Sequence, residues 1–245
     1  MSGHSHWNNI QHRKGAADAK RGRVWSKLSR AIMVAAKNGG SDPVMNVRLR
    51  VAIDDARSVS MPKENIERAV KKGSGELEGV SFDEITYEGF GPGGVAILVE
   101  ILTDNRNRTN GEVRKIFEKG GGNMGSPGCV KHMFERKGLF SIAAKDADED
   151  TLMGIALDAG ADDIKNEGDA FAITCDPTAF MTVKAALTKA NIPLAVAQIT
   201  QIGKAPVDCD TETGQKVLKL LEALDENDDV QNVYSNLNMT AAMMA

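Results

Sequence analysis

Residues 138–203 carry the pattern that most constrains the fold of this 245-residue chain. Strand-like and helix-like segments follow one another there in the order strand, helix, strand, strand, helix, strand. This is the order of a ferredoxin-like α+β module. The expected strands are 139–144, 163–166, 171–174 and 194–202, and the expected helices are 149–159 and 177–190.

The segments on either side of this module predict a second sheet. Strand-like runs at 85–87 and 95–101 flank a glycine-rich turn, a capping box at 109–112 begins a helix, and 129–134 is a further strand. A helix at 213–224 and a strand at 230–234 follow the module. Because that last pair cannot bury a core alone, we expect it to complete the earlier sheet, with the ferredoxin-like module inserted.

Residues 1–79 are expected to be helical. A polar arm at 1–14 precedes a helix at 15–38, a second helix begins at Asp42 and Pro43, and a third extends from Pro62 to Gly73. Residues 72–75 are interpreted as a hinge. The chain is therefore predicted to be an α+β protein with an N-terminal three-helix domain and two α+β domains, at 1–79, at 80–137 plus 204–245, and at 138–203.

Charge is divided unevenly along the chain. Residues 1–72 hold 15 Lys and Arg against 6 Asp and Glu, a net charge of +9, whereas residues 73–245 have a net charge of −13. Such asymmetry indicates a basic module that faces a polyanion, with the acidic remainder held away by repulsion. The acidic runs at 146–150 and 225–229 are expected to be solvated helix ends and loops.

The helix at 15–38 gathers cations on one sector of its surface. A run of charge is usually a solvated helix face, but only Asp18 is negative within 13–37, which favours contact with nucleic-acid phosphates. A second candidate contact is the segment 103–110 at a helix start, although capping by Asp104 and Thr109 would also explain it. The candidate nucleic-acid-binding residues are Arg13, Lys14, Lys20, Arg23, Lys27, Arg30, Lys37, Arg48, Arg50, Arg106 and Arg108.

Other classes of function find little support. Three histidines in the arm have no fourth ligand at usable spacing, so no metal site is predicted, and Trp7 either anchors the arm or stacks on a base. The cysteines lie far apart, and signatures of hydrolases, metalloproteases and phosphate-binding loops are missing. We expect a cytoplasmic, monomeric, non-enzymatic protein without a cofactor or a membrane segment.

Several longer motifs identify a family. They are GHSHW at 3–7, VAAKNGG at 34–40, MPKENIERA at 61–69, YEGFGPGGVA at 87–96 and LTDNRNRT at 102–109. Over its full length the chain resembles the YebC/PmpR family, whose mitochondrial relatives are translational activators of cytochrome c oxidase subunit I. His6 and Cys129 depart from the family pattern, which usually has Lys and Ser there.

The resemblance implies three domains, the last inserted in the second, and a cytoplasmic probable DNA-binding transcriptional regulator. A second activity attributed to relatives is assistance to ribosomes at difficult sequences such as proline runs. The sequence offers no clear helix-turn-helix for base readout, and phosphate contacts on folded RNA fit it equally well. We therefore expect a transcriptional regulator that contacts DNA phosphates through the basic helices, with a ribosome- or RNA-binding translation factor as the alternative.

Overall fold

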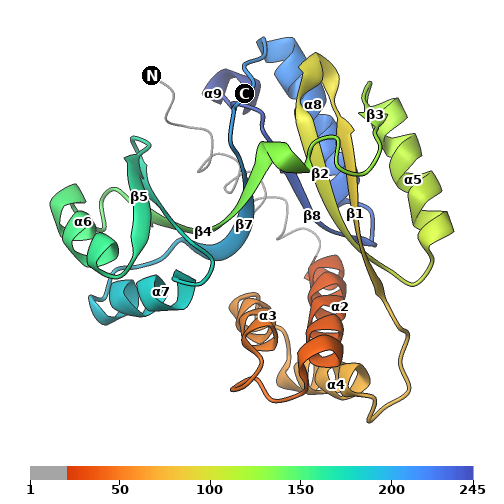
Figure 1. Cartoon of the computed structure of the whole chain (residues 1–245), viewed down its shortest axis with the longest axis horizontal. Coiled ribbons are helices and arrows are strands. Elements are labelled where there is room, and N and C mark those ends of the chain that lie inside the picture. The colour runs from red at the N-terminus through yellow and green to blue at the C-terminus, as the bar shows by residue number, and fades with distance from the viewer. Residues whose placement is uncertain (1–20, 245) are drawn as a thin grey trace.

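The structure is a computed structural model, which describes residues 21–244. Helices α2 (Arg21–Gly39), α3 (Val47–Ser58) and α4 (Lys63–Ser74) form a bundle beside two four-stranded antiparallel sheets (Figure 1). The fold is therefore α+β with an N-terminal helical region, as predicted. The arm at 1–14, with its histidines and Trp7, and the predicted helix start at residue 15 lie outside the described residues.

The bundle forms because each helix has one apolar face. Ile32 of α2, Leu49 of α3 and Ile66 of α4 are buried in one cluster. The predicted start of the second helix at Asp42 and Pro43 is wrong, because Asn46 is the N-cap of α3. Its Oδ1 accepts a hydrogen bond from the Leu49 amide at 3.0 Å, and its Nδ2 donates to the carbonyls of Ala35 and Gly40 at 2.8 Å.

The hinge at 72–75 stays a prediction, although residues 72–74 are helical. Gly73 lies inside the last turn of α4, which ends at Ser74 and is capped by Gly75, whose φ is +84°. A Cβ atom at Gly73 would stand 2.3 Å from the carbonyl oxygen of Met33 in α2. Gly73 therefore allows two helices to approach closely, which fixes the bundle instead of loosening it.

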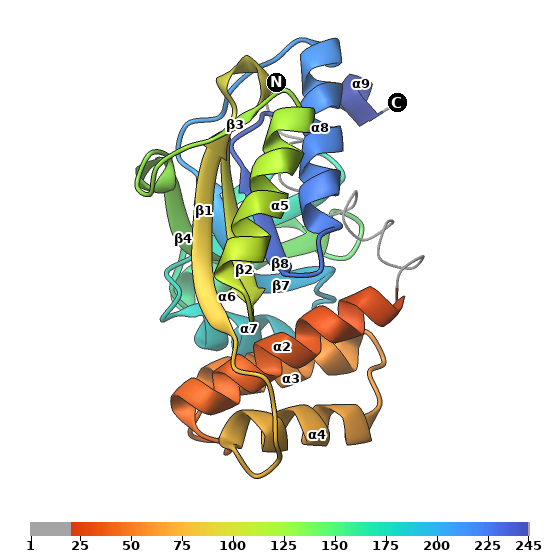
Figure 2. The ribbon, with the colours of Figure 1, turned by 90° about the vertical axis from the view of Figure 1, so that its right-hand side faces the viewer.

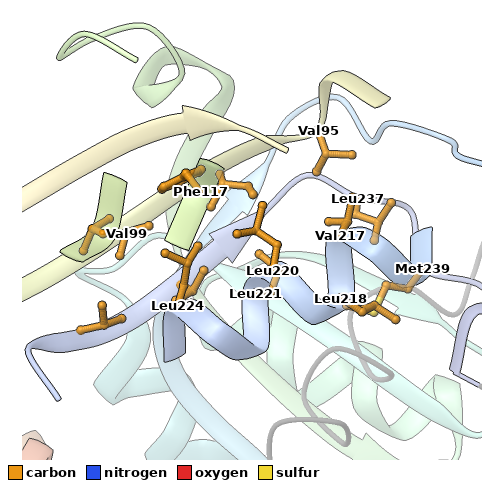
Figure 3. Packing of buried hydrophobic residues seen from close by; sticks show 14 of the residues in the cluster. Val95, Val99, Phe117, Val217, Leu218, Leu220, Leu221, Leu224, Leu237 and Met239 are labelled. Atoms are coloured by element: carbon orange, nitrogen blue, oxygen red, sulfur yellow. The ribbon is translucent and has the colours of Figure 1, made fainter. Parts of the chain in front are cut away.

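The first sheet has the strand order β3 (Asn123–Met124), β1 (Asp83–Phe90), β2 (Ala96–Thr103) and β8 (Val230–Ser235). Strand β8 pairs with β2, placing Val233 opposite Val99, so the C-terminal strand completes this sheet as predicted. Helices α5 (Arg106–Lys119) and α8 (Thr211–Asp225) lie along one face of it (Figure 2). Phe117, Leu220 and Leu224 fill the space between the helices and the sheet (Figure 3).

The predicted capping box at 109–112 is wrong, because α5 begins four residues earlier than this box implies. Asn105 is the N-cap, and its side chain accepts a hydrogen bond from the Arg108 amide at 3.1 Å. Thr109 is fully buried within the first turn of the helix. This earlier start brings Arg106 and Arg108 into the first turn of α5.

The predicted strand at 129–134 is a loop that ends in the short 3₁₀ helix η3 (Lys131–Met133). The buried carboxylate of Glu88 accepts hydrogen bonds from the amides of Gly128, Val130 and Lys131 at 2.7, 2.8 and 2.7 Å. These backbone donors are thereby withdrawn from strand pairing. Phe134, with Val130, then packs on the face of the first sheet opposite α5 and α8.

The second sheet has the order β5 (Ala161–Asn166), β6 (Ala170–Cys175), β4 (Phe134–Ala143) and β7 (Val196–Gly203). Together with α6 (Glu149–Asp158) and α7 (Phe180–Lys189), this is the predicted ferredoxin-like arrangement, inserted between β3 and α8. The short helices η2 (Pro92–Gly94) and α9 (Ala241–Met244) complete the described elements. The domain boundaries stay a prediction, and the one at 137/138 falls inside β4.

Candidate nucleic-acid interface

The basic face of α2 lies against an acidic segment of the same chain. This segment, residues 225–229, is the turn between α8 and β8, and we call it the acidic turn (Figure 2). Lys27 Nζ donates to the carbonyl and to Oδ1 of Asp225 at 2.6 and 3.1 Å, and Arg23 Nε lies 3.4 Å from Asp228 Oδ1. Burial lowers the pKa of Lys27, an effect that Asp225 offsets only in part.

Asp229 is the centre of this contact. Its Oδ1 accepts a hydrogen bond from Arg30 Nη1 at 3.0 Å, and its Oδ2 accepts from Arg108, Thr109 and Thr103 at 2.6, 2.7 and 3.0 Å. Only 4 % of Asp229 is exposed. Burial alone would raise the pKa of Asp229, but the hydrogen bonds from Thr109, Arg108 and Thr103 hold it below its usual value. One carboxylate therefore connects α2, β2 and α5.

A second group of contacts surrounds the start of β1. Arg48 binds Glu84 through both of its terminal nitrogens at 2.9 and 2.8 Å, which keeps the pKa of Glu84 below its ordinary value. Arg106 Nε donates to Asp83 Oδ2 at 2.8 Å, and Lys37 Nζ donates to the Ser81 hydroxyl at 2.7 Å. Seven candidates are thus gathered along the boundary between the bundle and the first sheet, namely Arg23, Lys27, Arg30, Lys37, Arg48, Arg106 and Arg108.

Two electrostatic expectations are therefore wrong. The acidic part of the chain does not stand clear of the basic helix, and 225–229 is not simply a solvated helix end, since Asp229 is buried. Arg30 is also paired across 199 residues of sequence and lies 5.4 Å from the centre of the Phe82 ring. The sequence does not reveal this pairing, because the opposite charges of the two parts of the chain are interpreted as repulsion of a polyanion and not as contact with each other.

Other cations of the bundle have no acidic partner among the described residues. Arg50 reaches only the carbonyl of Val44, at 3.4 Å, and Arg68 donates to the amide oxygen of Asn65 at 2.7 Å. Lys71 and Lys72 are exposed at the end of α4 and make no ion pair in the part of the chain that the structure covers. Arg68, Lys71 and Lys72 are not among the candidates nominated from the sequence.

Two hollows follow the boundary between the bundle and the first sheet. One, of about 460 Å³, is lined by charged residues that include Arg23, Arg108 and Glu112. The other, of about 750 Å³, lies between α2, the end of α3 and α8, where apolar groups such as Leu28 and Leu221 alternate with charged ones. Neither gathers the ligands of a metal ion, and residues 21–244 contain no group of three or more His, Cys, Asp or Glu side chains suited to one.

The matches to family models cover nearly the whole chain. Residues 5–76 match the TACO1/YebC protein N-terminal domain, and residues 82–237 match the TACO1/YebC second and third domain. The chain belongs to the TACO1/YebC family. The resemblance recognised in the motifs is thereby confirmed.

Similar proteins are described as regulators. A probable transcriptional regulatory protein of Geobacter sulfurreducens is 55 % identical over 100 % of this chain and 98 % of its own length. One of Rhodopirellula baltica is 54 % identical over 97 % of each chain. The crystal structure of a conserved hypothetical protein from Aquifex aeolicus, 50 % identical, superposes with a TM-score of 0.81 over 90 % of this chain and 91 % of that one. Within the described residues, no helix is both long and apolar enough to cross a membrane.

Proposed function

We propose that this protein is a non-enzymatic regulator of gene expression that binds nucleic-acid phosphates through its N-terminal bundle, with DNA as the first candidate. The observation that carries the proposal is the group of bundle cations without an acidic partner among the described residues. Such cations displace counterions from a phosphate backbone, which is favourable at low salt. The names of the relatives support the regulatory role. The cations are Arg50, Arg68, Lys71 and Lys72, whereas Lys37 donates to Ser81 and interacts with Asp83.

The candidate residues fall into two groups by exposure. The side chains of Lys27 and Arg30 are only 14 % and 21 % exposed, so phosphates do not reach them while the acidic turn is in place. The paired arginines Arg48, Arg106 and Arg108 keep 52 %, 64 % and 44 % of their side chains exposed. Because a guanidinium has five N–H donors, each can bind a phosphate and keep its carboxylate. Contacts from positions 13, 14 and 20 stay a prediction.

One feature of α4 supports the alternative of a ribosome- or RNA-binding translation factor. Helix α4 follows α3 after a short turn, the position of a recognition helix, which reads bases with its N-terminal residues. That end of α4 carries Glu64 and Glu67, whose charges repel DNA. Lys63 is also exposed at that end but pairs with Glu67, whereas the exposed Lys71 and Lys72, which make no ion pair among the described residues, lie at the C-terminal end of α4. This arrangement favours backbone and shape recognition, which suits folded RNA, including a ribosome stalled on a proline run.

A binding titration tests the proposal. Fluorescence anisotropy would follow a 20-base-pair DNA duplex and a ribosomal RNA hairpin of equal charge, between 50 and 300 mM NaCl. We expect affinity to fall steeply with salt. The double variant Lys71→Glu, Lys72→Glu should weaken binding and lower the salt slope by about 1 to 2.

The matched control is Lys145→Glu with Lys189→Glu, two exposed residues of the ferredoxin-like module. It makes the same change in net charge and should bind like the wild type. Equal losses in both double variants would contradict a binding surface on the bundle. If the protein binds the RNA hairpin more tightly than the DNA duplex, the RNA-binding translation factor becomes the favoured function.

A further inference from the structure

We propose that the acidic turn is an internal substitute for a phosphate backbone, which latches the bundle onto the first sheet until salt or a nucleic acid displaces it. The proposal rests on the function proposed above, since it states how that binding surface is controlled. It is carried by the position of Asp225, Asp228 and Asp229 against the face of α2 that was expected to bind phosphates.

The acidic turn engages the most basic face of α2. Arg23, Lys27 and Arg30 are spaced at i, i+4 and i+7, so they project from one side of the helix. All three contact the acidic turn, through carboxylates and through the backbone carbonyls of Asp225 and Asp228. A series of anionic and carbonyl oxygens that faces a row of cations has the chemistry of a phosphate backbone.

The contact between α2 and the acidic turn is weak enough to be reversible. The carboxylates of Asp225 and Asp228 are 59 % and 73 % exposed. Their partners are less exposed, Arg23 at 35 % and Lys27 at 14 %, so only the pair of Arg23 with Asp228 belongs to the exposed class, whose members change an equilibrium constant by no more than about fivefold. Salt also screens them, because the Debye length is only about 10 Å at 0.1 M ionic strength. The outer part of the latch is therefore weak enough for a polyanion to compete with it.

The other contacts of the boundary supply a pivot. Arg48 with Glu84 and Lys37 with Ser81 hold the far end of α2 beside the start of β1. Asp229 keeps Arg108, Thr103 and Thr109 when Arg30 leaves, so opening does not strand a buried charge. The N-terminal end of α2 can then move away from the acidic turn while the bundle stays attached to the sheet.

The latch has a consequence for binding. A phosphate backbone that reaches Lys27 and Arg30 must first replace Asp225 and Asp228, so the closed state opposes its own ligand. Weakening the latch should therefore increase affinity for nucleic acid. The opening of the latch and the binding of nucleic acid would each shift by about threefold to tenfold if the ion pairs of Asp225 and Asp228 are lost together.

Energy transfer between two dyes would measure opening directly in the full chain. Dyes would be attached to Lys63→Cys, at the start of α4, and Lys216→Cys, on α8, both exposed. Cys129 and Cys209 would be replaced by Ser, and Cys175 is buried and stays. The latch variant is Asp225→Asn with Asp228→Asn. Its matched control is Asp146→Asn with Asp150→Asn, which removes the same charge from exposed positions of the inserted module.

We expect the wild type and the control to lengthen their dye separation between 50 and 500 mM NaCl, whereas the latch variant already has a longer mean separation than either at 50 mM. The latch variant should also bind the DNA duplex about threefold to tenfold more tightly at 50 mM NaCl. A dye separation that responds to neither salt nor the latch substitutions overturns the latch. If the latch variant opens but binds the DNA duplex no more tightly than the wild type, the latch does not control binding. Opening by salt in a protein that binds neither duplex nor hairpin supports the latch and refutes the proposed function.

Discussion

Replacing Asp229 by Asn should strongly destabilise the protein. The carboxylate accepts hydrogen bonds from Arg30, Arg108, Thr103 and Thr109 and is almost fully buried. An amide keeps one acceptor oxygen but points an NH₂ group at one set of these donors. Removing one member of a buried charged network costs about 3–5 kcal/mol. Arg30 and Arg108 are partly exposed and can be hydrated in the variant, so we expect the free energy of unfolding to fall by about 2–4 kcal/mol.

Urea unfolding followed by circular dichroism would measure this loss. Asp228→Asn, in the same turn but with a side chain that is 73 % exposed, is the matched control and should change stability by less than about 0.5 kcal/mol. Because the pKa of Asp229 is lowered in the folded state, its ionised form stabilises the protein above the ordinary Asp value of 3.8, and this stabilisation is lost as the pH falls through the folded pKa. The difference between wild type and Asp229→Asn should therefore shrink at acidic pH. Equal stability of the two proteins at pH 7 would refute the role of Asp229 as the link between bundle and sheet.

Three further predictions concern the scaffold. Gly73→Ala should lower the free energy of unfolding by about 1–3 kcal/mol, and with it the melting temperature, because the new Cβ would meet the backbone of Met33. Gly111→Ala on α5, where the new Cβ meets open space, should leave the melting temperature unchanged or raise it. A rise in both variants would show that α2 and α4 are not in close contact. Glu88→Gln should speed hydrogen exchange at the amides of Gly128, Val130 and Lys131, which the exposed Glu118→Gln should not do, and unchanged exchange in both would mean that the carboxylate does not hold the loop. Burial raises the pKa of Cys175 to about 11, so iodoacetamide at pH 8 should label Cys175 more slowly than Cys129 or Cys209, and equal rates would contradict its position in the core.

The sequence predicted elements that depend on local periodicity. The ferredoxin-like order of 138–203 and the completion of the first sheet by β8 follow from alternating apolar patterns and from the need of a lone helix and strand for a core. Helix starts were less predictable. Both Pro43 and Thr109 carry common N-terminal signals, but Asn46 and Asn105 act as the caps because their side chains reach the free amides of the first turn.

The environment of the candidate cations could not be predicted locally. Whether Arg30 faces solvent or Asp229 depends on how the bundle sits on a sheet whose last strand is about 200 residues away. The opposite net charges of the two parts of the chain were visible in the sequence, but they fit an external polyanion and an internal acidic partner equally well. Only the fold separates the cations held by the acidic turn from those that remain exposed, such as Lys71 and Lys72.

The most direct test of a nucleic-acid-binding bundle is ultraviolet crosslinking in living cells, with sequencing of the attached nucleic acid and mapping of the crosslinked peptides. We expect specific nucleic acid joined to peptides of residues 21–74, and a marked reduction in the Lys71→Glu, Lys72→Glu variant. Discrete promoter DNA would identify a transcriptional regulator, and ribosomal RNA around one site would identify a translation factor. Crosslinks no more abundant than those of an unrelated protein of similar net charge, or confined to the ferredoxin-like module, would contradict the account.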